Sequence, residues 1–91
     1  MEFEWNPDKA KLNREKHDIS FEEAATVFDD VLSITFPDPD HSVGESRYII
    51  IGISRFGRLL IVSHTDRGAK VRIISARKAT RQERKFYEEG S

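Results

Sequence analysis

Three things are missing from this 91-residue chain: cysteine, long apolar runs and internal repeats. Without cysteine there is no disulfide framework and no thiolate chemistry, which fits a reducing cytosol, and a zinc ion would have to rely on histidine and carboxylates. The longest apolar runs, residues 48–51 and 59–62, are far too short to span a bilayer, and the acidic N-terminus is unlike a signal peptide. We therefore expect a single domain, residues 1–91, in a soluble protein of the cytoplasm.

Charge is abundant, and the two halves of the chain carry opposite signs. Residues 1–46 hold 4 basic and 12 acidic side chains, whereas residues 47–91 hold 11 basic and 4 acidic ones, so the net charge of -1 hides a split. A strongly basic half points to a polyanionic partner, because Lys and Arg displace the counterions of nucleic-acid phosphates on binding. The alternative is that the two halves fold together and neutralise each other.

Helix-start signals organise the first third of the chain. Residues 2–5, EFEW, alternate charged and aromatic side chains and predict a short strand with both aromatic rings on one face. The Asn-Pro pair at residues 6–7 predicts the start of a helix that runs to about His17. Ser20 and Glu23 have the spacing of a capping box, which predicts a second helix after Ser20.

Strand patterns fill the middle of the chain. A short run at residues 32–36 is followed by a turn-rich loop at 37–45, and three longer β-rich runs come next, at residues 47–54, 58–65 and 69–77. The spacers between these runs, RFG and DRG, are short and end in Gly, so the runs are predicted to form an antiparallel meander. Thr80 and Glu83 form another capping box and predict a last helix ending at about Glu89. The order of strand, two helices, sheet and helix predicts an α+β fold.

Strand alternation places the residues that could carry chemistry. It puts Arg72 and Arg77 on opposite faces of their strand, Arg77 with Val71, Ile73 and Ser75, and Arg72 with Ile74 and Ala76. Arg77 and Lys78 also lie at the junction with the last helix, whose N-terminal amides are an anion site. Basic side chains and free amides together predict a phosphate-binding site.

Phosphate binding by basic residues suits the cleavage of RNA. That reaction needs one group to deprotonate the 2′-hydroxyl, one to protonate the leaving 5′-oxygen, and positive charge to stabilise the transition state. His64, on the face of Leu60 and Val62, could be the acid or the base because imidazole titrates near neutrality. The alternative is a strand histidine that is hydrogen-bonded in or beside the core. His17 is expected at a helix C-terminus, where a cation suits the dipole, and His41 is expected in solvent.

Two other clusters have simpler explanations. A loop cluster could offer oxygens to a divalent cation, but it matches no recognised ligand spacing and is expected to be a flexible acidic turn; it consists of Asp38, Asp40, His41 and Glu45. The basic side chains of the last helix could be its solvated face, because they can form i, i+4 pairs with acidic residues; they are Arg81, Arg84 and Lys85.

Three segments of the sequence resemble one known family. They are FEWNPDKAKLNREKHDISFEEAATVF, PDPDH followed by GESRY, and RIISARKATRQERKFYE, and they cover almost the whole chain in the right order. They resemble the BrnT family of type II toxins, small ribonucleases with a fold like the RelE toxins; the most specific piece is RIISAR-x-A-T-x-x-E-R-x-x-Y. One departure is Asp18, where the family commonly has Gly. This residue is expected to end the first helix in the left-handed conformation, which Asp tolerates less well than Gly.

The resemblance implies a RelE-like fold and a metal-independent endoribonuclease without a cofactor, which cleaves RNA and inhibits translation. Its partner would be an antitoxin similar to BrnA, with a ribbon-helix-helix part through which the toxin reaches operator DNA. The implied catalytic residues are Arg72, Arg77 and Lys78, with His64 and Tyr87 as candidate acid or base. The implied RNA-binding residues are Arg47, Arg67 and Arg81. For Tyr87, packing of the last helix against the sheet is an equally good explanation.

A second hypothesis belongs to another class of function. The chain could be a non-catalytic module that holds RNA, or its antitoxin alone, through the basic surface. In that case it would act as a transcriptional corepressor and would bind RNA without cutting it. Growth arrest on expression, together with new RNA ends, distinguishes the ribonuclease from the binding module.

Overall fold

The computed structural model of the chain describes residues 1–41 and 46–90. The strands are β1 (Glu2–Glu4), β2 (Ile34–Pro37), β3 (Arg47–Ile53), β4 (Leu59–Arg67) and β5 (Lys70–Lys78). The helices are α1 (Pro7–His17), α2 (Phe21–Thr26) and α3 (Arg81–Glu89), with two short 3-10 helices, η1 (Val27–Asp29) and η2 (Pro39–His41). Each predicted helix and strand is present, with ends shifted by at most one or two residues. No helix within the described ranges is long and apolar enough to cross a membrane.

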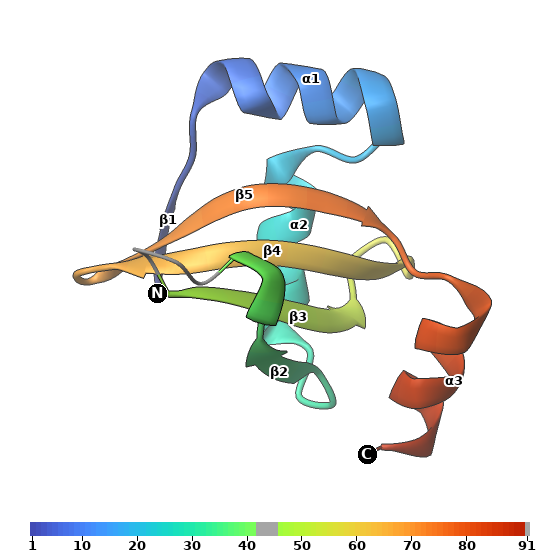
Figure 1. Ribbon diagram of the computed structural model, residues 1–91. Helices are drawn as coiled ribbons and strands as arrows, with labels where there is room; N and C mark the ends of the chain where they lie inside the picture. Colours follow the sequence, from blue (N-terminus) through green and yellow to red (C-terminus); the bar gives the residue numbers. More distant parts are fainter. Residues whose placement is uncertain (42–45, 91) are drawn as a thin grey trace.

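The strands form one sheet in the order β1-β5-β4-β3-β2 (Figure 1). β3, β4 and β5 are the predicted antiparallel meander, and β2 adds to it antiparallel to β3. β1 is the exception, because it runs parallel to β5 and so brings the start of the chain beside its last strand. The result is a mixed sheet with three helices, which confirms the α+β class.

The first helix begins and ends as its sequence predicts. The Asn6 side chain accepts hydrogen bonds from the backbone N–H groups of Asp8 and Lys9, at 2.8 and 3.1 Å, and Pro7 occupies the first helical position. At the other end, Asp18 has φ 58° and ψ 37°, the left-handed conformation expected there. Asp18 therefore holds a backbone geometry that glycine adopts more readily.

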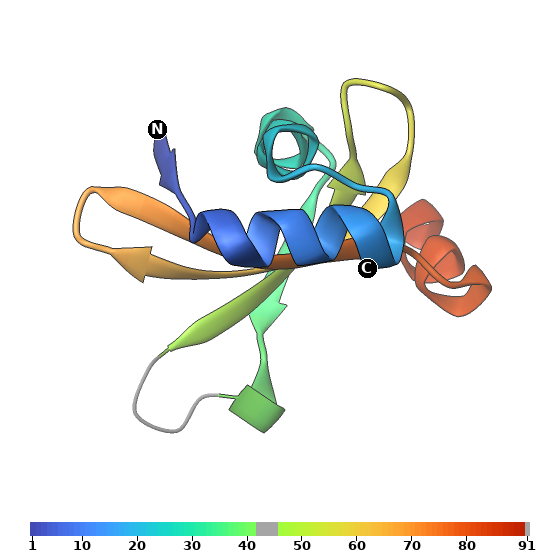
Figure 2. The ribbon, with the colours of Figure 1, turned by 90° about the horizontal axis from the view of Figure 1, so that it is seen from above.

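Asn13 fastens α1 to the edge of β5. β1 pairs with β5 at residues 70–72, so within the described chain it does not reach the backbone of Ala76. The Asn13 side chain takes that place: its Oδ1 accepts from the N–H of Ala76 at 3.1 Å, and its Nδ2 donates to the Ala76 carbonyl at 2.9 Å. One buried amide thus pairs with the strand as a neighbouring strand would, and it fixes α1 along β5 (Figure 2).

Of the two hydrogen bonds that make up the capping box predicted at Ser20, the structure contains the one accepted by the Ser20 side chain. The Ser20 hydroxyl accepts from the N–H of Glu23 at 3.0 Å, so α2 begins where predicted. The Glu23 carboxylate instead binds Arg58 through Nε, at 2.9 Å, and through Nη2, and it accepts from the Ser54 hydroxyl at 2.7 Å. Arg58 lowers the pKa of this buried carboxyl. The reciprocal half of the box was wrong because a bidentate guanidinium is the stronger partner for a buried carboxylate.

The sheet has a helix face and an open face. α1 and α2 pack on the helix face, where Phe21 and Leu60 are fully buried. Figure 1 shows α2 behind the strands and α1 above β5. The open face carries Ile51 and Ile61 and receives α3, whose Tyr87 packs against this smaller cluster.

Gly52 lets η1 approach the helix face of β3 closely. A Cβ at this position would lie 2.9 Å from Cγ1 of Val27 and 3.1 Å from Cβ of Ser33. Both distances are too short for a side chain without a shift of the neighbours. Glycine is therefore required by the packing here.

A bulge in β5 breaks the simple alternation of its side chains. Ser63 of β4 pairs with Ser75 of β5, but the next residue, His64, pairs with Ile73. Ile74 is the extra residue. Such an insertion reverses the face on which each later side chain lies.

The bulge brings Arg72 and Arg77 onto the same face. Arg72 pairs with Thr65 and Arg77 pairs with Ile61, and these two β4 residues share the open face because they are four apart. The prediction that the two arginines lie on opposite faces was therefore wrong. The residues of β5 that are buried on the helix face are Val71, Ile73 and Ala76.

Candidate functional site

Four arginines of three neighbouring strands point to the open face. Arg47 of β3 and Arg72 of β5 both lie opposite Thr65 of the strand between them, and Arg67 follows Thr65 by two residues. Arg77 lies on the same face near the other end of β5. The β4 partners of Arg72 and Arg77, Thr65 and Ile61, are four residues apart, which is roughly 13 Å of strand. Positive charge thus follows the sheet as a track that could contact successive phosphates.

Arg77 is held by Glu83 of α3. Its Nη1 and Nη2 each donate to one Glu83 carboxylate oxygen at 2.8 Å, a bidentate pair. Arg77 lowers the pKa of Glu83 to about 2, so this carboxyl is ionised at every physiological pH. Within the described residues the hydrogen bonds of Arg77 use Nη1 and Nη2, which leaves the Nε side of the guanidinium for a second anion.

The other end of the track contains a similar pair. Nη1 of Arg72 donates to Glu4 of β1 at 2.6 Å, and both side chains are about one-third exposed. The pair joins the acidic half of the chain to its basic half, as Glu23 and Arg58 do on the other side of the molecule. The predicted neutralisation of the two halves is therefore real at these contacts. Partly exposed pairs of this kind are weak, and a phosphate can compete for the arginine.

Lys78 and Arg81 lie apart from the track. Lys78 pairs with Leu60, which is buried on the helix face, so Lys78 extends to the opposite side from Arg77. Arg81 is the exposed first residue of α3. The cluster predicted from Arg72, Arg77 and Lys78 is thus spread along β5 and over both faces.

His64 is buried on the helix face, and within residues 1–41 and 46–90 neither of its ring nitrogens has a hydrogen-bond partner. Its side chain lies between two rings, with centroids 4.8 Å from Phe28 and 6.0 Å from Tyr48, and the residue is 5 % exposed. Burial lowers the pKa of His64, and the nearby negative charge of Asp66 acts in the opposite direction. The sheet separates His64 from Arg77, so the two cannot act on one phosphate. His17 ends α1, as predicted.

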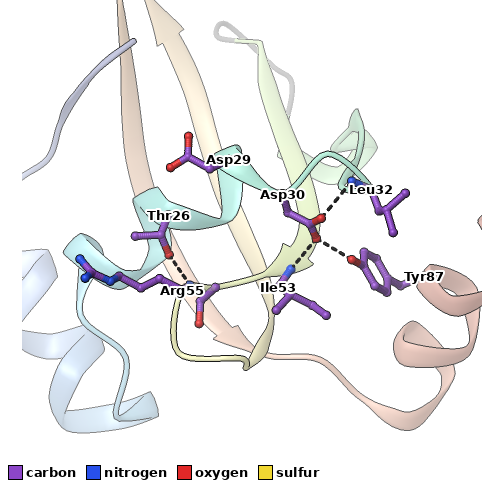
Figure 3. A pocket seen from close by; sticks show the side chains of 8 residues that line it. Thr26, Asp29, Asp30, Leu32, Ile53, Arg55 and Tyr87 are labelled. Atoms are coloured by element: carbon purple, nitrogen blue, oxygen red, sulfur yellow. Dashed lines mark hydrogen bonds between the residues drawn. The ribbon is translucent and has the colours of Figure 1, made fainter.

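Tyr87 fastens α3 to the turn before β2 (Figure 3). Its hydroxyl donates to Oδ2 of Asp30 at 2.5 Å, and the same carboxylate accepts from the N–H groups of Ile53 and Leu32 at 2.8 and 2.9 Å. Burial, with the hydrogen bond to Asp30, raises the pKa of Tyr87 to about 12. A phenol that is held by a carboxylate is poorly suited to exchange protons with a substrate. The geometry favours the packing explanation for this residue.

The acidic loop is described only in part. Asp38 is buried, and its Oδ1 accepts from the N–H of Asp40 at 3.2 Å. Glu45 and the side chain of His41 lie outside the described residues. Within residues 1–41 and 46–90, no group of three or more His, Cys, Asp or Glu side chains could hold a metal ion.

Sequence reasoning missed the carboxylates that hold the arginines. Glu83 was assigned to the capping box at Thr80, which it does form, because its Oε1 also accepts from the N–H of Thr80 at 2.8 Å. The same oxygen binds Arg77. No signal in the sequence indicates that Arg77 binds Glu83. The contact between Glu4 and Arg72 could have been predicted only if the pairing of β1 with β5 had been known. That pairing requires a parallel contact that local patterns do not reveal.

The sequence and the fold were both compared with those of known proteins. The sequence profile of the family described as "Ribonuclease toxin, BrnT, of type II toxin-antitoxin system" matches residues 5–83. The chain is similar to the 1.1 Å crystal structure of the Brucella abortus ribonuclease toxin BrnT, with a TM-score of 0.71 and 21% sequence identity; the match covers 89% of this chain and 99% of that one. At this identity the structural likeness shows a common fold. No curated protein matches the sequence.

Proposed function

Because the chain belongs to the BrnT family of ribonuclease toxins of type II toxin-antitoxin systems, we propose that it is a metal-independent endoribonuclease whose substrate lies along the open face of the sheet. The 2′-hydroxyl of the RNA gives its proton to water and attacks the neighbouring phosphorus. The bond from phosphorus to the 5′-oxygen breaks, the 5′-oxygen takes up a proton from water, and a 2′,3′-cyclic phosphate remains. Cleavage of cellular RNA in the cytoplasm then inhibits translation. The ends of the products identify the reaction.

One observation carries this proposal: the bulge in β5 brings Arg72 and Arg77 to the same face as Arg47 and Arg67. Arg77 stabilises the charge that develops on the phosphorane, because its guanidinium is oriented in advance by Glu83. The other three arginines bind the phosphates on either side. Fixed positive charge of this kind supplies the electrostatic stabilisation that a metal ion supplies in other nucleases.

His64 and Tyr87 take no part in proton transfer in this proposal. His64 lies on the other face of the sheet, and the hydroxyl of Tyr87 is held by Asp30. Charge stabilisation at Arg77 is the main contribution to the rate. Removal of one such donor typically lowers an enzyme's rate by about 100- to 1000-fold.

The partner follows from the same family. A type II system supplies a protein antitoxin, and we propose one similar to BrnA with a ribbon-helix-helix part. The toxin joins operator DNA through this antitoxin and not through its own residues. An acidic segment of the antitoxin would compete with RNA for the open face.

The first test compares wild type with Arg77→Ala in growing cells and in solution. Growth arrest and new RNA ends are expected with wild type alone, and the purified protein should cut unstructured RNA in the presence of EDTA. Circular dichroism shows whether the variant is folded. Binding of RNA by wild type without cleavage would refute the enzyme and favour the corepressor hypothesis. Loss of cleavage in EDTA, restored by a divalent cation, would refute metal independence.

A further inference from the structure

An apolar groove of about 560 Å³ lies on the open face beside α3. Its floor is formed by Ile34, Ile51 and Ile61, one from each of three neighbouring strands. Phe36 of β2 and Phe86 of α3 form its walls, and their rings meet edge to face with centroids 6.2 Å apart. The two phenylalanines are 36% and 39% exposed, so part of each ring is open to solvent.

The groove is next to the proposed phosphate position. Glu83 lines the groove and binds Arg77, and Ile61 in its floor is the cross-strand partner of Arg77. A nucleotide whose phosphate contacts Arg77 can therefore place its base in the groove. The groove and the guanidinium of Arg77 are separated by about the distance between neighbouring side chains on one face of a sheet, because Ile61 and Arg77 are cross-strand partners.

The groove contains one uncharged hydrogen-bonding side chain among the residues described, that of Gln82. A primary amide carries both donors and an acceptor, so it can pair with the polar edge of a base. Unpaired bases present flat apolar faces together with such an edge, and proteins that bind single-stranded RNA stack these faces on aromatic rings. An aliphatic side chain of a protein would make no use of the amide.

We propose that this groove is a nucleobase subsite, in which an unpaired base of the RNA packs against Phe36 and Phe86 while Gln82 bonds to its edge. The proposal rests on the ribonuclease function and adds to it the feature that selects the cleaved sequence. Arg47, Arg67, Arg72 and Arg77 contact phosphates and carry no base preference. Discrimination among bases then resides in Gln82 and the two rings.

The test measures base preference instead of total activity. Cleaved ends of a random-sequence RNA are sequenced for wild type, Gln82→Ala, Phe86→Leu and the control Phe56→Leu, whose ring is 69% exposed in the loop between β3 and β4. At one position beside the cut, the ratio between the most and least favoured base should fall about fivefold or more in the first two variants. The control should keep the wild-type ratio. An unchanged ratio in both groove variants, with cleavage retained, would overturn the subsite.

A second measurement separates this proposal from the ribonuclease function. If wild type does not cleave RNA, nuclear magnetic resonance with a non-cleavable 2′-deoxy trinucleotide still reports on the groove. Shifts of the Gln82 side-chain amide and the Phe86 ring support the subsite, and their absence at saturating probe overturns it. A groove that serves the antitoxin would show the opposite pattern: Phe86→Leu would weaken antitoxin binding and leave the base ratio unchanged. That outcome also overturns the proposal.

Discussion

On the helix face of the sheet neither ring nitrogen of His64 has a hydrogen-bond partner among the described residues, whereas on the open face Arg72 and Arg77 each bind a carboxylate. The buried histidine is the residue with the more favourable ordinary pKa for catalysis, yet it contacts two aromatic rings on the face opposite the proposed site. The arginines never lose their charge, and they are exposed enough to meet an anion. In our proposal the face of the sheet on which a residue lies therefore matters more for its role than its ordinary pKa does.

The largest expected effect comes from the arginine next to α3. Arg77→Ala should lower the initial rate of RNA cleavage by about 100-fold or more, because charge on the phosphorane loses its stabilising donor. Stability should fall by about 1 kcal/mol, since the partly exposed pair with Glu83 is lost. Arg14→Ala, which removes the same charge from α1, is the control and should cut RNA at the wild-type rate. A loss as large with Lys78→Ala would contradict a site confined to one face.

The next effect is on binding. The double variant Arg47→Ala/Arg72→Ala should weaken binding of a non-cleavable single strand about tenfold and flatten the dependence of log affinity on log salt by roughly 1.4, or about 0.7 for each lost phosphate contact. Titrations at several salt concentrations measure both quantities. Circular dichroism confirms folding, because Arg72 also binds Glu4. An unchanged slope would remove these residues from the track.

A smaller effect concerns the hydroxyl that holds α3. Tyr87→Phe should lower the free energy of unfolding by about 1–2 kcal/mol, because the bond to Asp30 is lost. Cleavage should stay within about threefold of wild type, since in our proposal the hydroxyl exchanges no proton with substrate. Urea denaturation and initial rates measure the two effects. Inactivity of a folded Tyr87→Phe protein would return this residue to the list of acids and bases.

The smallest effect tests the helix face. His64 has its pKa lowered by burial, so below the unfolded pKa of about 6.5 the unfolded chain binds a proton that the folded chain does not. Wild-type stability should therefore fall between pH 7.5 and 5.5. His64→Phe lacks this loss and should be more stable relative to wild type at pH 5.5 than at pH 7.5, by about 1 kcal/mol or less. Urea midpoints at both pH values measure the difference, and a cleavage rate lost in the folded variant would place His64 in the mechanism after all.

Local sequence signals were enough to predict the helices and strands, but not the arrangement of the residues in the candidate site. The caps at Asn6, Ser20 and Thr80 located three helix starts because each acts within a few residues. The bulge at Ile74 escaped prediction because strict alternation also explained the apolar pattern of β5. Because of this bulge Arg72 and Arg77 lie on the same face of the sheet and not on opposite faces as predicted, and the proposed site depends on this arrangement. The family resemblance identified the chemistry before the geometry could be derived.

The same limit applies to contacts between distant residues. Glu23 was expected to complete a capping box, and its bond to Arg58 depends on a packing that no spacing reports. For the stretch that contains Asn13 the sequence predicted only a helix, and not that its amide would hydrogen-bond to the backbone of Ala76 in β5. Polar residues with long-range partners are the ones that patterns of a few residues assign incorrectly.

The parallel pairing of β1 with β5 has a consequence for how the protein is made. Glu4 binds Arg72, which is 68 positions later in the sequence, so β1 cannot pair with β5 until those later residues are present. The five-stranded sheet can therefore close only after β5 has been synthesised, and contacts so distant in sequence slow the final step of folding.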